Sequence, residues 1–181
     1  SDSAVKFRNG GDGLGRGLEI LLRRVHTAGG SGWISYAYSV SRRRDGEGEA
    51  WHPFDFHQPH IAGLVASWKA TPRLGVGLKA RWATGGAYSP VIGRTFDQAG
   101  SRWTPVRGAT NSARYPNYAR VDLRIQMDVL KRRPNFRIYI ELLNALGRKN
   151  VQAYLWNSDF SARTTLYQLP RLPYAGLDLE F

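Results

Sequence analysis

Residues 119–129 alternate between apolar and polar side chains without a single exception, and this pattern limits the possible fold more than any other feature. Apolar residues hold every odd position, and the even positions read Arg, Asp, Arg, Gln and Asp. Successive side chains of a β-strand point to opposite faces, so this strand has one apolar face and one charged face.

Such a strand suits a membrane barrel better than a soluble sheet. A half-buried soluble strand also alternates, but it seldom has room for the four charges that this row carries. A transmembrane barrel requires the alternation, because one face meets lipid and the other meets a polar interior. About 9 to 11 residues cross a bilayer when a strand is tilted, and the segment has this length.

The same alternation recurs in other parts of the chain. The further segments are residues 18–23, 33–40, 62–68, 74–83, 136–142 and 174–181. No apolar run approaches the roughly 20 residues that a transmembrane helix needs. The sequence therefore predicts an all-β fold of seven antiparallel strands.

The connections between these segments alternate between short turns and long loops. The short ones are residues 26–32, 71–73 and 131–135, and the long ones are residues 42–59, 85–116 and 147–173. Residues 85–116 show no convincing periodicity, which would be unusual in a compact soluble domain. Outer-membrane barrels have short turns on one side of the membrane and long loops on the other, so the pattern favours a barrel.

Aromatic residues lie near the predicted strand ends. Trp33, Trp68, Trp82 and Tyr118 occupy positions where an interfacial belt of a membrane protein belongs. Each of them alone fits equally well as a core aromatic of a soluble sheet, but their common placement supports the belt.

Seven strands do not close a membrane barrel. An open sheet leaves main-chain groups without partners in hydrocarbon, and bacterial single-chain barrels have even strand numbers. No signal peptide is visible at the start of the chain. We therefore expect a processed protein or a part of a larger barrel, with the remainder in the same or a separate polypeptide.

Composition leaves one competing class of function. Cysteine is absent, so the chain forms neither disulfides nor thiolate metal sites. The net charge of +12 is typical of proteins that bind nucleic acid or an anionic surface. The basic runs at residues 42–44 and 131–133 fall at opposite ends of the predicted strands, however. Lipopolysaccharide and phospholipid headgroups would attract them there, whereas a nucleic-acid surface gathers its charge on one face.

Three stretches in the first half of the chain resemble segments of TonB-dependent outer-membrane receptors. Residues 9–23 resemble a strand that follows an NxG motif and reads GxELLLR. Residues 56–68, FHQPHIAGLVASW, resemble DQPHxLxLVASY, and residues 81–91, RWATGGAYSPV, are similar to RYATGRPYTPV.

Three stretches in the second half resemble the same family. Residues 118–124, YARVDLR, are similar to YxRLDLR, and residues 141–150, ELLNALGRKN, to LDVxNLFNRKN. Residues 167–173, YQLPRLP, resemble the start of YQLPRxPxxGxxxEF. These matches follow the order of the family and cover nearly the whole chain.

The resemblance implies that residues 1–181 form part of a 22-stranded barrel and contain no plug domain. Receptors of this family bind scarce ligands such as siderophores, cobalamin or glycans, and import them with energy from the TonB complex. The chain would be integral to the bacterial outer membrane, with its C-terminus in the periplasm. Phe181 resembles the terminal signal that the barrel-assembly machinery reads, and it also fits a lipid anchor.

Charged residues of both signs line the predicted polar side of the strands, where they would face the plug. They are Glu19, Arg23, Lys79, Arg81, Arg120, Asp122, Arg124, Asp128, Arg137, Glu141, Asp178 and Glu180. A catalytic carboxylate pair drawn from this row has no nucleophile, metal or leaving-group site beside it. We therefore expect a polar wall rather than an enzyme, with no catalytic residue and no cofactor.

Aromatic and polar residues of the long loops are the candidate ligand-binding set. They are Trp51, His52, Phe54, Phe56, His57, Tyr88, Arg94, Phe96, Trp103, Tyr154 and Trp156. His52, Asp55 and His57 offer nitrogen and oxygen ligands for a metal, but their spacing matches no recognised site, so we predict no metal. Arg94, Arg102, Arg107 and Arg114 would attract an anionic ligand.

Two alternatives remain open at this point. One is a soluble, basic, antiparallel β protein that binds nucleic acid. The other is a small barrel closed on itself by an eighth strand from residues 1–9, including a lipid-modifying enzyme of that kind.

Overall fold

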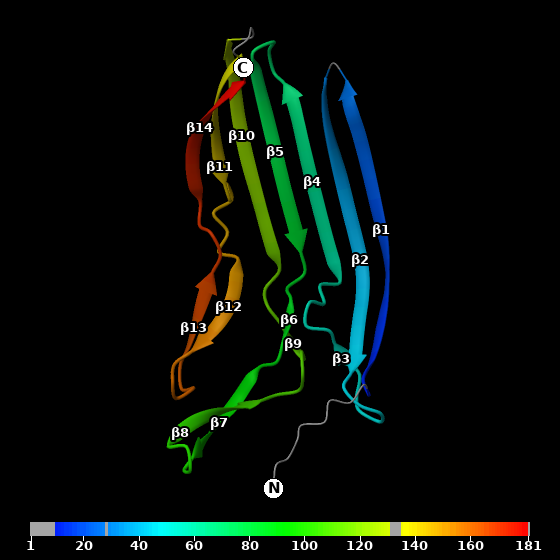
Figure 1. Cartoon of the computed structure of the whole chain (residues 1–181), viewed down its shortest axis with the longest axis vertical. Helices are drawn as coiled ribbons and strands as arrows, with labels where there is room; N and C mark the ends of the chain where they lie inside the picture. The colour runs from blue at the N-terminus through cyan, green and yellow to red at the C-terminus, as the bar shows by residue number, and fades with distance from the viewer. Residues whose placement is uncertain (1–9, 28, 131–134, 181) are drawn as a thin grey trace.

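The computed structural model describes residues 10–27, 29–130 and 135–180, and these residues form antiparallel β-structure throughout (Figure 1). Phe181, the basic run 131–133 and the strand imagined for residues 1–9 lie outside the described residues. Within the described part of the chain there is no helix long and apolar enough to cross a membrane.

All of the predicted strand segments form one main sheet, in chain order. Its strands are β1 (Asp12–Thr27), β2 (Gly30–Arg44), β4 (His60–Lys69), β5 (Leu74–Ala83), β10 (Tyr118–Leu130), β11 (Asn135–Leu143) and β14 (Leu172–Glu180). A short strand, β3 (His52–Pro53), pairs with the end of β2. The prediction of an all-β, antiparallel fold is therefore confirmed.

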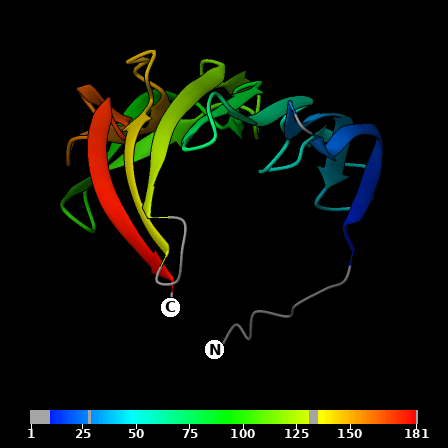
Figure 2. The ribbon, with the colours of Figure 1, turned by 90° about the horizontal axis from the view of Figure 1, so that it is seen from above.

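The main sheet is strongly curved and open. Seen along the strands, it follows an arc whose two ends are β1 and β14 (Figure 2). Among the described strands, β1 pairs only with β2, and β14 only with β11. The outer edges of these two strands therefore present main-chain donors and acceptors that no described strand uses.

The long connections contain strands that the sequence reading missed. Residues 85–116, which we expected to lack periodic structure, form a hairpin of β7 (Val91–Asp97) and β8 (Arg102–Arg107), and also the pair β6 (Ala87–Tyr88) and β9 (Ala113–Arg114). Residues 147–173 contain a second hairpin, β12 (Val151–Trp156) and β13 (Arg163–Tyr167). All of them lie beyond the same end of the main sheet, here called the loop end (Figure 1).

Strand pairing sorts the side chains of the main sheet onto two faces. The face that carries Leu123 and Ile125 also carries their partners Leu78 and Val76 on β5, and we call it the apolar face. The opposite face carries Arg124, and we call it the polar face. No register shift interrupts the pairing of β10 with β5, so the separation is maintained along both strands.

The apolar face is largely exposed. Ile125, Ile140 and Leu177 on this face are 54%, 64% and 66% exposed. On the polar face, Asp122 is only 6% exposed, whereas Asp178 on the edge strand is exposed. Among the described residues, the buried hydrophobic side chains are those of Ala83 and Ala87 alone. The described residues thus lack a conventional core, and their apolar surface is exposed.

Ion pairs and close ring contacts stabilise the polar face. Arg124 lies 3.5 Å from both Glu141 and Asp178, and its guanidinium stacks 3.8 Å from the centroid of the Tyr139 ring. Tyr139 in turn covers Gly176 of the next strand, where a Cβ would collide with the phenol. Glycine at this position therefore lets the ring lie flat across the sheet.

Asparagine side chains continue the hydrogen bonding where β11 ends. Asn144 adopts a left-handed conformation with φ of 49°, and its main-chain N–H donates to Asp122 at 2.8 Å. Further on, the Asn150 side chain bonds both main-chain groups of Ala119, at 3.0 and 2.9 Å. The Asn150 contacts satisfy main-chain groups of β10 beyond the last residue of its neighbour, and the Asn144 contact fixes the turn after β11 to Asp122.

The four aromatic residues expected near strand ends lie on different faces. Trp68 and Trp82 lie on the apolar face, opposite Val76 and Ala62. Trp33 is on the polar face, where its ring covers Gly63, and Tyr118 lies on that face below the Arg81 guanidinium. The interfacial belt therefore stays a prediction, and alternation along β2 and β10 turns the rings of Trp33 and Tyr118 to the polar side.

We expect Gly176→Ala to lower the free energy of unfolding by about 1 to 3 kcal/mol, because the new Cβ displaces Tyr139 and with it Arg124. Gly77→Ala is the control: its Cβ would lie 3.5 Å from that of Arg124, an ordinary contact. Urea unfolding of the protein in detergent micelles measures both. Equal destabilisation by the two variants would contradict the role assigned to Tyr139.

Candidate functional site

A cluster of three tyrosines marks the loop end of the sheet. The ring of Tyr88 stacks on that of Tyr115 at 4.5 Å between centroids, and Tyr154 meets both, at 5.4 and 5.1 Å. The rings come from β6, from the segment after β9 and from β12, which are far apart in sequence. The cluster therefore ties the two long connections together.

A hollow of about 410 Å³ opens beside this cluster, and we call it the rim hollow. The residues of its lining that carry its chemistry are Tyr88, Tyr154, Trp156, Arg107, Arg163 and Asp55. Arg163 stacks over Tyr154 at 4.0 Å. The size lies within the range of small-molecule sites, and flat rings with guanidinium groups suit a ligand that has both planar and anionic parts.

Burial alters the chemistry of Tyr115, which reaches the hollow from behind Tyr88. Desolvation of the phenol is the main cause that raises its pKa above the usual value of 10.0. The hydroxyl is thus protonated at neutral pH, and it acts as a neutral hydrogen-bonding group rather than as a base.

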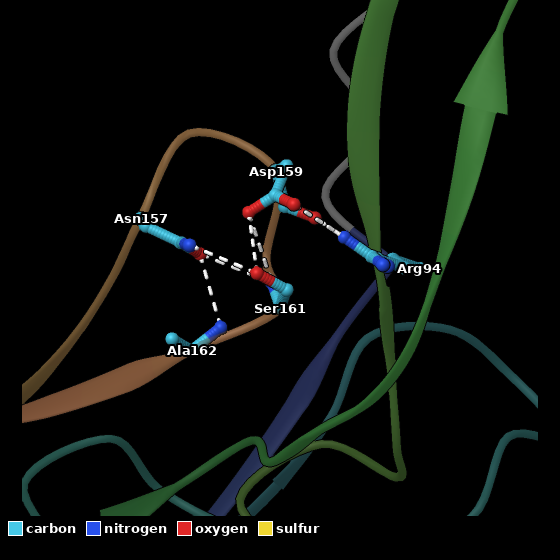
Figure 3. Close-up of polar contacts among 5 residues, drawn as sticks. All are labelled: Arg94, Asn157, Asp159, Ser161 and Ala162. Carbon is cyan, nitrogen blue, oxygen red and sulfur yellow. Dashed lines mark hydrogen bonds and ion pairs between the residues drawn. The ribbon is translucent and has the colours of Figure 1, made fainter.

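An ion pair joins the β7–β8 hairpin to the turn of the β12–β13 hairpin (Figure 3). Arg94 of β7 donates to the Asp159 carboxylate at 2.6 Å and to its main-chain carbonyl at 3.0 Å. The same guanidinium stacks 4.5 Å from the centroid of Trp103, which also contacts Phe96. This contact spans 65 positions in the sequence and sets the distance between the hairpins.

The turn that presents Asp159 is held by its own side chains. The Asn157 Oδ1 accepts the main-chain N–H groups of Ser161 and Ala162 at 3.0 and 3.1 Å (Figure 3). Ser161 donates its hydroxyl to Asp159 at 2.8 Å. That hydrogen bond is the main cause that lowers the pKa of Asp159, and Arg94 adds to it. The carboxylate is therefore held charged and oriented.

His57 is a buried anchor of the loop that follows β2. It is 8% exposed, and Arg114 of β9 donates to its Nδ1 at 2.8 Å and to its carbonyl at 2.9 Å. Because an arginine only donates, the imidazole must accept at Nδ1 and carry its proton on Nε2. Burial first, and then the charge of Arg114, lower the pKa of His57 below 6.5, so the ring is neutral at pH 7.

The remaining predicted loop residues contact different partners. His52 lies 3.2 Å from Asp45, Trp51 lies under Arg44, and Phe54 meets the exposed Phe56 in a T-shaped contact. Asp55 accepts from Asn111 at 2.6 Å. In the described ranges there is no group of three or more side chains that could hold a metal ion.

The structure thus divides the predicted ligand-binding set into three groups. Tyr88, Tyr154 and Trp156 line the rim hollow. Arg94, Phe96 and Trp103 form the hairpin contact. The others, Trp51, His52, Phe54, Phe56 and His57, belong to the loop after β2 and do not line the hollow.

Sequence reasoning missed Tyr115, Asp159 and Arg163. Tyr115 follows Arg114 in a segment that looked irregular, and Asp159 and Arg163 flank a turn with no periodic signal. An Asn-x-Asp-x-Ser run, residues 157–161, is a local sign of a side-chain-capped turn and was the one usable clue.

Several charges of the predicted wall pair on the polar face. Arg120 bonds Asp122 at 2.7 Å, and Arg137 bonds Asp128 at 2.8 Å. Glu141 and Asp178 share Arg124. The other members, Glu19, Arg23, Lys79, Arg81 and Glu180, have no ion-pair partner within 4.0 Å among the described residues.

Comparison of the chain with known protein families, with curated proteins and with solved structures gives no match.

We expect His57 to titrate below pH 6.5, and Arg114→Gln to raise its pKa by removing a nearby positive charge. Between the lowered pKa and 6.5 the folded protein binds fewer protons than the unfolded chain. The contribution of His57 to stability is therefore complete above pH 6.5 and is lost as the pH falls through the lowered pKa. Imidazole NMR shifts measure the titration, and a His57 pKa at or above 6.5 would contradict its burial.

We also expect Arg94→Gln to raise the pKa of Asp159 and to loosen the hairpin contact, because the carboxylate loses a charged donor. Carboxylate NMR titration and limited proteolysis at residues 157–162 report the two effects. Arg102→Gln is the control, since Arg102 lies on the partner strand of the same hairpin but pairs with Asp97, at 3.8 Å. Equal proteolysis of both variants would show that Arg94 does not join the hairpins.

Proposed function

We propose that this chain is a barrel-wall and outer-loop part of a TonB-dependent outer-membrane receptor that imports a scarce ligand. The observation that carries the proposal is the exposure of the apolar face. An apolar face with Ile125, Ile140 and Leu177 more than half exposed is stable only where something other than water covers it. Lipid hydrocarbon covers the outer wall of such a barrel.

The polar face supports the same function. Its charges pair across strands, as in Arg124 with Glu141 on the next strand and Asp178 on the strand beyond it, which suits a surface that faces water or a plug. A nucleic-acid surface would keep its arginines available for phosphates, whereas Arg120, Arg124 and Arg137 are each bound to a carboxylate.

The open sheet indicates the partners. In hydrocarbon, the free edges of β1 and β14 need further strands, so the wall is completed by additional barrel from the same or another polypeptide. A plug domain would fill the lumen and contact TonB, and the barrel-assembly machinery would insert the wall into the outer membrane. The rim hollow, with its tyrosines, Arg107 and Arg163, is the proposed ligand contact of this part.

We expect Ile125→Arg to lower the stability of the protein in lipid vesicles by about 2 to 4 kcal/mol, because it places a charge against hydrocarbon. Gln126→Arg, one residue further on, puts the same side chain on the polar face, where it replaces the amide that accepts from Arg124 at 3.1 Å, and should cost less than Ile125→Arg. Unfolding of vesicle-inserted protein by denaturant measures both variants.

Two results would overturn the proposal. One is equal destabilisation by the two substitutions, since only a bilayer distinguishes the faces in this way. The other is a protein that is monodisperse in plain buffer without detergent, because its apolar face would then need no lipid.

A further inference from the structure

Arginines continue the apolar face of β1 and β2 at the loop end of the sheet. The register pairs Arg16 with Val40 and Arg42 with Leu14, so both arginines lie on the same face as Leu18. They are diagonal neighbours across the two strands, a relation that places Cα atoms about 7 to 8 Å apart. Two long guanidinium side chains at this spacing reach a common anion.

Below these arginines, the face changes from aromatic to aliphatic in the order that a lipid would require. Tyr38 pairs with Leu18 and lies 5.1 Å from the His60 ring, and Tyr36 is hydrogen-bonded to His60 at 2.7 Å. Further along, Leu22 and its partner Ile34 are 66% and 54% exposed. Rings with polar tips belong at a headgroup boundary, and aliphatic side chains belong below it.

The charges of Arg16 and Arg42 are available to a ligand. Both side chains are exposed, and no carboxylate of the described residues lies within 4.0 Å of either. Arg44, on the same face, is already bound to Asp12 and stacked over Trp51. The Asp12 carboxylate, the nearest acidic group on this face, is thus neutralised by Arg44 and does not repel an incoming anion.

At the loop end of the apolar face, the charged group lies on β1 and β2. At the same end of the apolar face, β5 and β10 present Trp82 and Ala119, and β11 and β14 present Leu142 and Pro173. A general attraction to anionic membranes would need no such confinement. A localised pair of arginines above an exposed aliphatic strip instead suits one lipid with its phosphate at a defined height.

We propose that Arg16 and Arg42, with the strip below them, bind the phosphorylated and multiply acylated glycolipid of the outer leaflet, lipopolysaccharide. Its phosphate accepts charge-assisted hydrogen bonds from the two guanidinium groups, and its acyl chains lie along Leu18, Leu22 and Ile34. The inference rests on the proposed function, in which the loop end faces outward and the apolar face meets lipid.

The test is binding of lipopolysaccharide to the intact protein in one detergent, measured by calorimetry. We expect the double variant Arg16→Gln/Arg42→Gln to bind at least about tenfold more weakly, because two charged donors are lost. Arg43→Gln is the matched control: Arg43 directly follows Arg42 in the sequence, lies on the opposite face and pairs with Asp45 at 3.0 Å. It should keep the affinity of the unaltered protein.

Two further ligands distinguish this site from a general attraction to anionic lipids. Dephosphorylated lipopolysaccharide and phosphatidylglycerol should both bind the unaltered protein as weakly as lipopolysaccharide binds the double variant. The inference would be overturned if lipopolysaccharide bound the double variant as tightly as the unaltered protein, or if either of the other lipids bound the unaltered protein as tightly as lipopolysaccharide does. Saturation of the site by inorganic phosphate would overturn it too. Arg16→Lys/Arg42→Lys keeps the charge and should retain part of the affinity, which excludes a folding defect as the cause.

Failure of this inference and failure of the proposed function give different results. A protein that enters vesicles and shows the contrast between Ile125→Arg and Gln126→Arg, yet binds lipopolysaccharide equally in all variants, refutes the site alone. A protein that does not enter vesicles refutes both.

Discussion

The structure depends on one unbroken main-chain register through the middle of the sheet. From Met127 opposite Leu74 to Tyr118 opposite Ala83, β10 follows β5 without a shift. A slip by one residue would turn every side chain of the strand to the other face. Arg124 would then lie among Leu78 and Val76, and its contacts with Glu141, Asp178 and Tyr139 would be lost. The ion pairs of one face and the apolar surface of the other are thus consequences of the same hydrogen-bond ladder.

How much of the fold could be predicted depends on how far apart in the sequence the interacting residues lie. A period of two residues is a local property, so the strands of the main sheet could be located from the sequence. The surroundings of an aromatic residue are harder to predict, because tryptophan and tyrosine fit on either face of a strand. Alternation within its own strand places Trp33 opposite Ile34, and Gly63 on the neighbouring strand leaves room for its ring. Only the pairing of the two strands reveals the contact with Gly63.

The candidate site depends still more on distant contacts. Tyr88 and Tyr154 were expected to contribute, but their meeting point is Tyr115, which no periodic pattern marks. Asp159 becomes informative only once Arg94 lies against it, 65 positions away in the sequence. The strands of hairpins β7–β8 and β12–β13 have only five to seven residues, so alternation does not identify them. Asp122, expected as one charge of a wall, also holds the turn at Asn144.

The described residues bury almost no apolar side chains, so the stability of this protein depends on something other than a core. In a soluble domain the volume of the core limits stability, but here Ala83 and Ala87 are the only apolar side chains that the described residues bury. In the proposed setting, hydrocarbon supplied by the membrane takes the place of that core. Bilayer thickness and lipid packing would then act on this chain as core substitutions act on a soluble domain.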